Sequence, residues 1–107
     1  MNFVIQVIEP KGILDGTKTV EFQYQIDQNI ESGAHIILVD FQNVTFMDSS
    51  GLGALVKALK TVNAADVKLF LCSLNDQIKM LFELTSMDLY FSICANREEF
   101  EKQLPKL

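Results

Sequence analysis

The sequence predicts an α/β fold with a mixed, mostly parallel sheet of about five strands and about four helices packed chiefly on one side. The first observation is that short apolar runs alternate along the chain with longer amphipathic stretches. The second is residues 36–39, four consecutive aliphatic residues that indicate a strand buried on both faces at the centre of the sheet. Because helices separate successive strands, we expect right-handed crossovers and parallel neighbours.

The N-terminal residues predict a β-hairpin. Residues 3–8 are almost entirely apolar, which indicates a strand with a buried face. A Pro-Lys-Gly turn follows at residues 10–12. Ile13 and Leu14 would begin a second short strand, and this hairpin would supply the antiparallel part of the mixed sheet.

Residues 17–32 fit two patterns. Apolar and polar residues alternate from Val20 to Ile26, which is typical of a strand. Phe22, Ile26 and Ile30 also recur every four residues, and a Ser-Gly pair at the end is a common helix stop. The length of the segment and its lack of turn residues favour a helix.

The second half of the chain predicts two further strands and two further helices. Residues 67–72 form a strongly apolar strand, and residues 73–76 (SLND) open a helix. The expected inner face of that helix consists of Ile78, Leu81, Phe82 and Thr85. Residues 89–94 would form a last, shorter strand. Asn96 would cap a terminal helix that docks through Phe100 and Leu104.

The composition is that of an ordinary globular protein, and we expect a single domain over residues 1–107. The formal net charge is −5, which argues against a direct nucleic-acid partner and against attachment to anionic membranes. No segment approaches the roughly 20 apolar residues of a membrane span. The first residues lack the features of a signal peptide, so we expect a cytoplasmic protein.

The two cysteines and the single histidine do not point to a metal site or to an enzyme. Cys72 and Cys94 lie far apart in the sequence without a Cys-x-x-Cys pair, which favours two buried thiols in a reducing compartment. A catalytic serine needs a base within hydrogen-bond reach. His35 begins the central strand, at the opposite end from the serines described next. We therefore predict no catalytic residue, metal or cofactor.

The most informative stretch covers residues 44–60 (VTFMDSSGLGALVKALK). Asp48, Ser49, Ser50 and Gly51 separate an apolar strand from an amphipathic helix. Asp and Ser are helix-start residues because their side-chain oxygens accept from free amides of the first turn. That position also tolerates added negative charge. On the residues alone, helix capping by both serines is favoured over a modification site.

Residues 46–53 (FMDSSGLG) resemble the STAS domain signature, in particular that of bacterial anti-sigma factor antagonists. Residues 12–15 (GILD) match the Gly-x-Leu-Asp of the same family. Residues 85–90 depart from it, because a Ser-Gly-Leu turn is more usual there. The resemblance implies a STAS-like fold and identifies Ser49 as the phosphorylated serine.

The same resemblance implies a phosphoprotein that acts in signal transduction by partner switching. The unphosphorylated chain would bind an anti-sigma factor that is also a serine kinase, which releases a sigma factor for transcription. Phosphorylation of Ser49 would end this binding, and a serine phosphatase would restore it. The expected partner surface comprises Met47, Asp48, Ser49, Ser50, Gly51 and Lys57. A monomer is the default oligomeric state.

Several alternatives stay open from the sequence. Asp48 could stabilise the helix start, help a kinase to position the Ser49 hydroxyl, or contact the partner. Gly51 and Gly53 could admit a partner's backbone or let the helix lie close to the sheet. Of Phe46 and Met47, one should face outward. The chain could also be a docking subunit of another signalling or transport complex, or a small nucleotide-binding module.

Overall fold

The computed structural model describes residues 3–104, and its main sheet has four parallel strands in the order β1-β3-β5-β6. These strands are β1 (Ile5–Ile8), β3 (Ile36–Asp40), β5 (Lys68–Cys72) and β6 (Ser92–Cys94). All five residues of β3 are buried. The predicted central strand is therefore confirmed, with β1 on one side of it and β5 on the other.

The predicted hairpin is wrong. The second strand, β2 (Gly12–Leu14), pairs in parallel with β4 (Val44–Met47) in a separate two-stranded sheet. Gly12 has a φ of 73° and donates its N–H to the carbonyl oxygen of Asn43 at 2.8 Å. The turn thus directs the chain toward the start of β4 instead of back along β1. Every strand pair within residues 3–104 is parallel.

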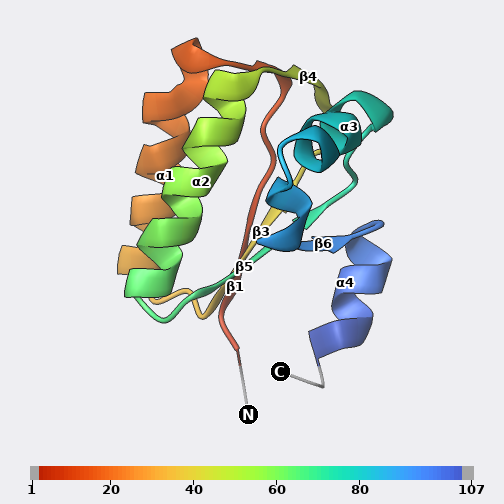
Figure 1. Ribbon diagram of the computed structural model, residues 1–107. Helices are drawn as coiled ribbons and strands as arrows, with labels where there is room; N and C mark the ends of the chain where they lie inside the picture. The colour runs from red at the N-terminus through yellow and green to blue at the C-terminus, as the bar shows by residue number, and fades with distance from the viewer. Residues whose placement is uncertain (1–2, 105–107) are drawn as a thin grey trace.

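Helices cover both faces of the main sheet, as Figure 1 shows. They are α1 (Thr19–Glu31), α2 (Ser49–Ala64), α3 (Asp76–Leu84) and α4 (Arg97–Gln103). The first three helices share the larger hydrophobic core with one face of the sheet, whereas α4 packs against the other face. The predicted α/β class with mostly parallel strands and four helices, chiefly on one side, is confirmed. No helix among residues 3–104 is long and apolar enough to cross a membrane.

The ambiguous segment 17–32 is a helix, as predicted. It begins with a 3-10 turn, η1 (Gly16–Lys18), and continues as α1. Phe22 and Ile26 are buried, while Val20 and Tyr24 are exposed on the outer side of α1. The alternation that resembled a strand therefore reflects apolar residues on both sides of one helix.

The last third agrees with the prediction except at its strand. Residues 87–89 form a 3-10 turn, η2 (Met87–Leu89), and β6 starts only at Ser92. Ser86 has a φ of 58°, in the left-handed region, which turns the chain before it can extend. The start of the strand predicted for residues 89–94 is thus wrong. Asn96 caps α4 by accepting the N–H of Glu99 at 2.8 Å.

The predicted docking residues of the last two helices lie as expected, with the exception of Thr85. Ile78 and Phe82 of α3 are buried in the larger core, and Leu81 packs against it from a partly buried position. Phe100 of α4 is buried in the smaller core, with Leu104 packed against it. Thr85 is exposed, so its predicted place on the inner face of α3 is wrong; its hydroxyl donates to the carbonyl oxygens of Leu81 and Phe82.

Candidate functional site

The start of α2 is capped by Asp48. Its backbone is extended, with φ −104° and ψ −176°, and a carboxylate oxygen accepts the N–H of Gly51 at 3.0 Å. Ser49 is consequently the first residue of the helix and Ser50 the second. The predicted capping role belongs to Asp48 alone, so the interpretation of both serines as caps is wrong.

Ser49 and Ser50 are both exposed. Within residues 3–104, neither hydroxyl has a hydrogen-bond partner in the protein. A serine at this position lies next to the amides of the first helical turn, where the helix dipole favours negative charge. The arrangement therefore presents two hydroxyls to solvent at a point that accommodates an anion.

Gly51 is buried, in contrast to the serines. A Cβ atom at this position would lie 2.2 Å from the carbonyl oxygen of Leu14 and 2.9 Å from Cγ of Met47. Gly51 thus lets the first turn of α2 lie directly on β2, which is one of the two predicted explanations for its presence. Its predicted contact with a partner is wrong because the residue is covered. Gly53 is exposed, and a Cβ there would meet open space.

Met47 is also covered, with an exposed fraction of 0%, while Phe46 is 46% exposed. The register between β2 and β4 shifts at Gly12 and Ile13, so that an extra residue, Thr45, lies in β4. Such a bulge reverses the inside and outside positions that follow it. Met47 consequently packs in the core, and its predicted partner contact is wrong. Phe46 is the member of the pair that faces outward.

Lys57 lies on a groove between α1 and α2. The groove has a volume of about 670 Å³ and begins beside Ser50. Its α1 side carries Val20 and Tyr24, which are 82% and 62% exposed. On the α2 side, Gly53 leaves the groove open, and Lys57 contributes a positive charge. The predicted residues Ser50 and Lys57 therefore belong to one surface, together with two apolar side chains that the sequence assigned only to a helix.

A second polar group, which sequence reasoning missed, joins α4 to the carboxyl end of β3. The Asp40 side chain is 1% exposed; it accepts Arg97 Nε at 2.7 Å and the N–H of Gln42 at 2.9 Å. Arg97 also contacts Glu9 through Nη2 at 2.8 Å. Burial opposes ionisation of Asp40, but the bonds from Arg97 and Gln42 outweigh it, so the pKa of Asp40 is lowered. In the sequence, this group could have been suspected only from an acidic residue, Asp40, at the end of an aliphatic strand.

The cysteines are closer together than the sequence indicates. Cys72 and Cys94 are register partners on the neighbouring strands β5 and β6, and both are buried, free thiols. Burial raises the pKa of Cys72 to about 11 and also raises that of Cys94. Both groups stay protonated near neutral pH and are therefore poor nucleophiles and metal ligands.

His35 is held in a structural role at the amino end of β3. Its Nδ1 accepts the N–H of Val4 at 2.8 Å, and its ring packs edge-on against Phe3 with centroids 6.2 Å apart. His35 therefore lies at the start of the central strand, where the sequence predicted it. Within residues 3–104, no group of three or more His, Cys, Asp or Glu side chains is arranged to hold a metal ion.

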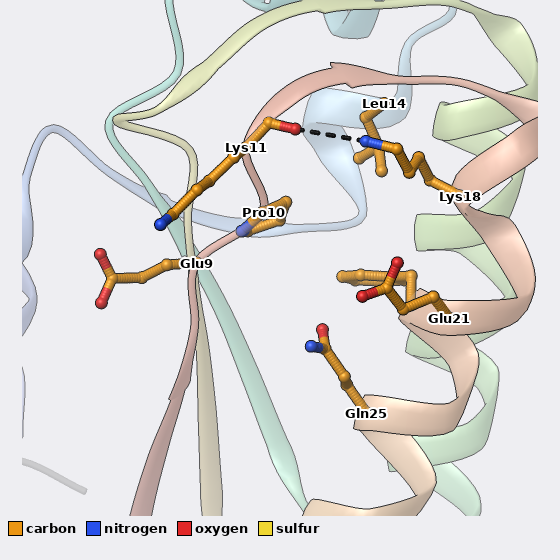
Figure 2. A pocket seen from close by; sticks show the side chains of 8 residues that line it. Glu9, Pro10, Lys11, Leu14, Lys18, Glu21 and Gln25 are labelled. Atoms are coloured by element: carbon orange, nitrogen blue, oxygen red, sulfur yellow. Dashed lines mark hydrogen bonds between the residues drawn. The ribbon is translucent and has the colours of Figure 1, made fainter.

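A smaller pocket of about 220 Å³ lies between the β1–β2 connection and the start of α1 (Figure 2). Glu9 and Lys11 line one side, and Lys18, Glu21 and Gln25 the other. Lys18 Nζ donates to the carbonyl oxygen of Lys11 at 3.5 Å. The pocket carries both signs of charge and includes none of the residues Asp48 to Gly51, so we do not assign it to the serine site.

The fold and the site together define a small, parallel α/β domain that exposes two serine hydroxyls at the start of a helix. A family model for the STAS domain matches residues 4–100. The anti-sigma-B factor antagonist of Staphylococcus aureus is 36% identical over 76 residues, which cover 71% of this chain and 70% of that protein. The corresponding protein of Staphylococcus epidermidis is 33% identical over the same shares. The chain belongs to the STAS domain family, as one of its anti-sigma factor antagonists.

Solved structures agree with this fold. The unphosphorylated anti-sigma factor antagonist SpoIIAA superimposes with a TM-score of 0.72 at 22% identity, over 100% of this chain and 96% of that one. The phosphorylated form of the Bacillus protein SpoIIAA gives 0.66 at 23% identity, over 90% and 87%. A sulfate transporter family protein of Wolinella succinogenes gives 0.82 at 14% identity, over 96% and 88%. The matched relatives are anti-sigma factor antagonists, which are regulatory proteins and not enzymes, so the prediction that the chain is not an enzyme is confirmed.

Proposed function

We propose that the unphosphorylated chain binds an anti-sigma factor that is also a serine kinase, and that phosphorylation of Ser49 ends this binding. Binding releases a sigma factor and favours transcription, and a serine phosphatase returns the chain to its binding form. The cycle operates in the cytoplasm. The observation that carries the proposal is the Ser49 hydroxyl at the first position of α2, which is exposed and has no hydrogen-bond partner among residues 3–104.

The chemistry of this position suits a reversible phosphate. A phosphoserine carries a charge of roughly −1.5 to −2 at neutral pH and three strong acceptor oxygens. Amides in the first turn of α2 and the positive end of the helix dipole stabilise such a group. The Gly51 amide is already held by Asp48, so the helix start need not rearrange. Phosphorylation should therefore change the surface that a partner meets and leave the fold intact.

The partner surface that we propose contains Asp48, Ser49, Ser50 and Lys57, together with the exposed side chains of the groove. Val20 and Tyr24 supply apolar area in the groove that Ser50 also lines. An anti-sigma factor that covers this groove would bury apolar contacts and face Lys57 with an acidic or polar group. A phosphate on Ser49 would add to the negative charge of Asp48 next to this interface, and like charges brought together there weaken binding.

The proposal is tested by phosphate mapping and binding measurements. Mass spectrometry of the chain isolated from its own cells should find one phosphate, on Ser49, which is absent from Ser49→Ala and retained in Ser50→Ala. Titration calorimetry with the anti-sigma factor of the same organism should give tight binding by wild type and Ser49→Ala. Ser49→Asp should bind at least about tenfold more weakly, because it adds charge at the interface. A chain that stays unmodified under all growth and stress conditions would contradict the proposal.

A further inference from the structure

The strand that leads into the serine site is held along its outer edge by side chains of α3. One edge of β4 pairs with β2. On its other edge, Gln77 Oε1 accepts the N–H of Met47 at 2.9 Å, and Gln77 Nε2 donates to the carbonyl oxygen of Met47 at 2.8 Å. Asn75 Nδ2 donates to the carbonyl oxygens of Val44 and Thr45 at 3.3 and 3.2 Å. Two amide side chains thus take the place of a neighbouring strand.

These side chains are themselves fixed by the start of α3. Asn75 caps the helix by accepting the N–H of Ile78 at 2.9 Å, so its amide group has one orientation available. Gln77 lies one residue inside the helix, partly buried, and spans both polar groups of a single residue of β4. Ile78 is completely buried in the core, which anchors the helix that presents both amides.

The clamped residue lies directly before the serine site. Met47 precedes the cap residue Asp48, whose N–H points to the other side and lies 3.4 Å from the carbonyl oxygen of Leu14. Successive residues are therefore held from opposite sides, Met47 by α3 and Asp48 by β2. The Ser49 hydroxyl follows two residues after the contact with Gln77. Its own side chain has no partner in residues 3–104, so its position depends on this backbone.

We propose that Gln77, with Asn75, is a positioning residue that fixes the Ser49 hydroxyl for phosphoryl transfer. This inference rests on the proposed function. The groove part of the docking surface, with Val20, Tyr24 and Lys57, lies on α1 and α2, whereas Gln77 contacts Met47 of β4. Loss of the clamp should thus leave the groove contacts in place and misplace the nucleophilic oxygen of Ser49. A small displacement of the Ser49 oxygen from its position facing the transferred phosphoryl group reduces the rate of the chemical step far more than it reduces binding.

The test compares the full-length wild type with Gln77→Met, which keeps the side-chain length and removes both hydrogen bonds. Gln77→Glu keeps the acceptor for the Met47 N–H but turns a carboxylate oxygen toward the Met47 carbonyl oxygen, and it serves as the second variant. Gln103→Met is the matched control. Gln103 Nε2 donates to Cys94 Sγ at 3.3 Å in the smaller core, on the face of the sheet opposite α2.

Initial rates of Ser49 phosphorylation are measured by phosphopeptide mass spectrometry, with ATP and a lysate of cells that lack the gene as the kinase source. We expect Gln77→Met to lower the maximal rate about tenfold with less than a threefold change in the apparent KM. Gln77→Glu should also lower the maximal rate, because it loses the hydrogen bond to the Met47 carbonyl oxygen. Gln103→Met should change neither parameter. Amide hydrogen exchange at Asp48 and Ser49 should be faster in both Gln77 variants than in wild type.

The outcomes separate the inference from the function on which it rests. A folded Gln77→Met or Gln77→Glu chain that is phosphorylated at the wild-type maximal rate would overturn the positioning role and leave the function standing. A rise in KM alone would also overturn it, because the effect would then lie in docking. A wild type that accepts no phosphate on Ser49 would overturn both.

Discussion

The Cβ position of Gly51 lies 2.2 Å from the carbonyl oxygen of Leu14, so the first turn of α2 rests directly on the backbone of β2. This contact joins the two segments of the chain that carry the family resemblance, residues 12–15 and residues 46–53. A carbonyl oxygen of the backbone cannot move aside as the end of a flexible side chain can. The glycine therefore determines how far α2 can approach the small sheet, and with it where the serines lie.

Gly51→Ala should destabilise the protein by roughly 2–3 kcal/mol, because the added methyl group overlaps Leu14 and Met47. Gly53→Ala is the matched control in the same helix. Its Cβ would meet open space, so the substitution should stabilise the protein by about 0.5–1 kcal/mol through the unfolded state and helix propensity. Urea unfolding of both variants gives the free energies. Equal stability of the two variants would contradict the packing described here.

Asp48→Ala should cost about 1 kcal/mol of stability, since the N–H of Gly51 loses its acceptor. Asp48→Asn keeps a capping oxygen and removes the charge, so its stability should stay close to that of wild type. The pair separates the capping role of Asp48 from its roles toward the kinase and the partner. If Asp48→Asn is as stable as wild type but is phosphorylated more slowly at Ser49, the charge acts on the kinase or partner. If Asp48→Asn is phosphorylated at the wild-type rate, Asp48 acts only as a helix cap.

Arg97→Met should destabilise the protein by about 3 kcal/mol at neutral pH, because it leaves Asp40 charged and buried without its main partner. The matched control is Lys102→Met on the same helix. Lys102 Nζ lies 3.9 Å from Glu98 Oε1 and both side chains are largely exposed. Loss of this ion pair should therefore have almost no effect on the free energy of unfolding. Thermal unfolding of the two variants measures the difference.

The stability of wild type and that of Arg97→Met should depend on pH with opposite signs. The pKa of Asp40 is lowered in the folded wild type, so the stability that it contributes is present above its unfolded pKa of about 3.9 and is lost as the pH falls through the folded value. In Arg97→Met, burial without the guanidinium should raise the pKa of Asp40. That variant should then become more stable as the pH is lowered from neutral toward 5. A parallel pH profile for the two proteins would contradict this assignment.

Local patterns predicted the parts of the fold that local physics determines. The aliphatic residues of β3, the four-residue recurrence in α1 and the polar start of α2 all form the expected elements. Pairings between distant segments could not be predicted in this way. Hydrophobic patterning gave no reason for β2 to pair with β4 instead of with β1, and the bulge at Thr45 reversed the positions of Phe46 and Met47.

The polar contacts between distant elements were missed for the same reason. Asp40 and Arg97 are separated by 57 residues, and Met47 and Gln77 by 30. Neither pair leaves a periodic pattern, because each depends on the packing of a helix against a strand that ends near it. The exposed serines were predictable because a helix start has a typical residue composition that can be recognised in the local sequence. The hydrogen bonds from Gln77 to the strand before the serines depend on tertiary structure.

The groove between α1 and α2 should contribute to partner binding without contributing to stability. Tyr24→Ser and Lys57→Glu change side chains on its opposite walls, and each should weaken binding of the anti-sigma factor about tenfold in titration calorimetry. Their free energies of unfolding should stay within about 0.5 kcal/mol of wild type, since surface substitutions of this kind rarely do more. Leu84→Ser is the control. Leu84 is 78% exposed on α3 and does not line the groove, so its variant should bind like wild type. If Leu84→Ser weakens binding while Tyr24→Ser does not, the partner surface lies over α3, and the serine site must then be approached from that side.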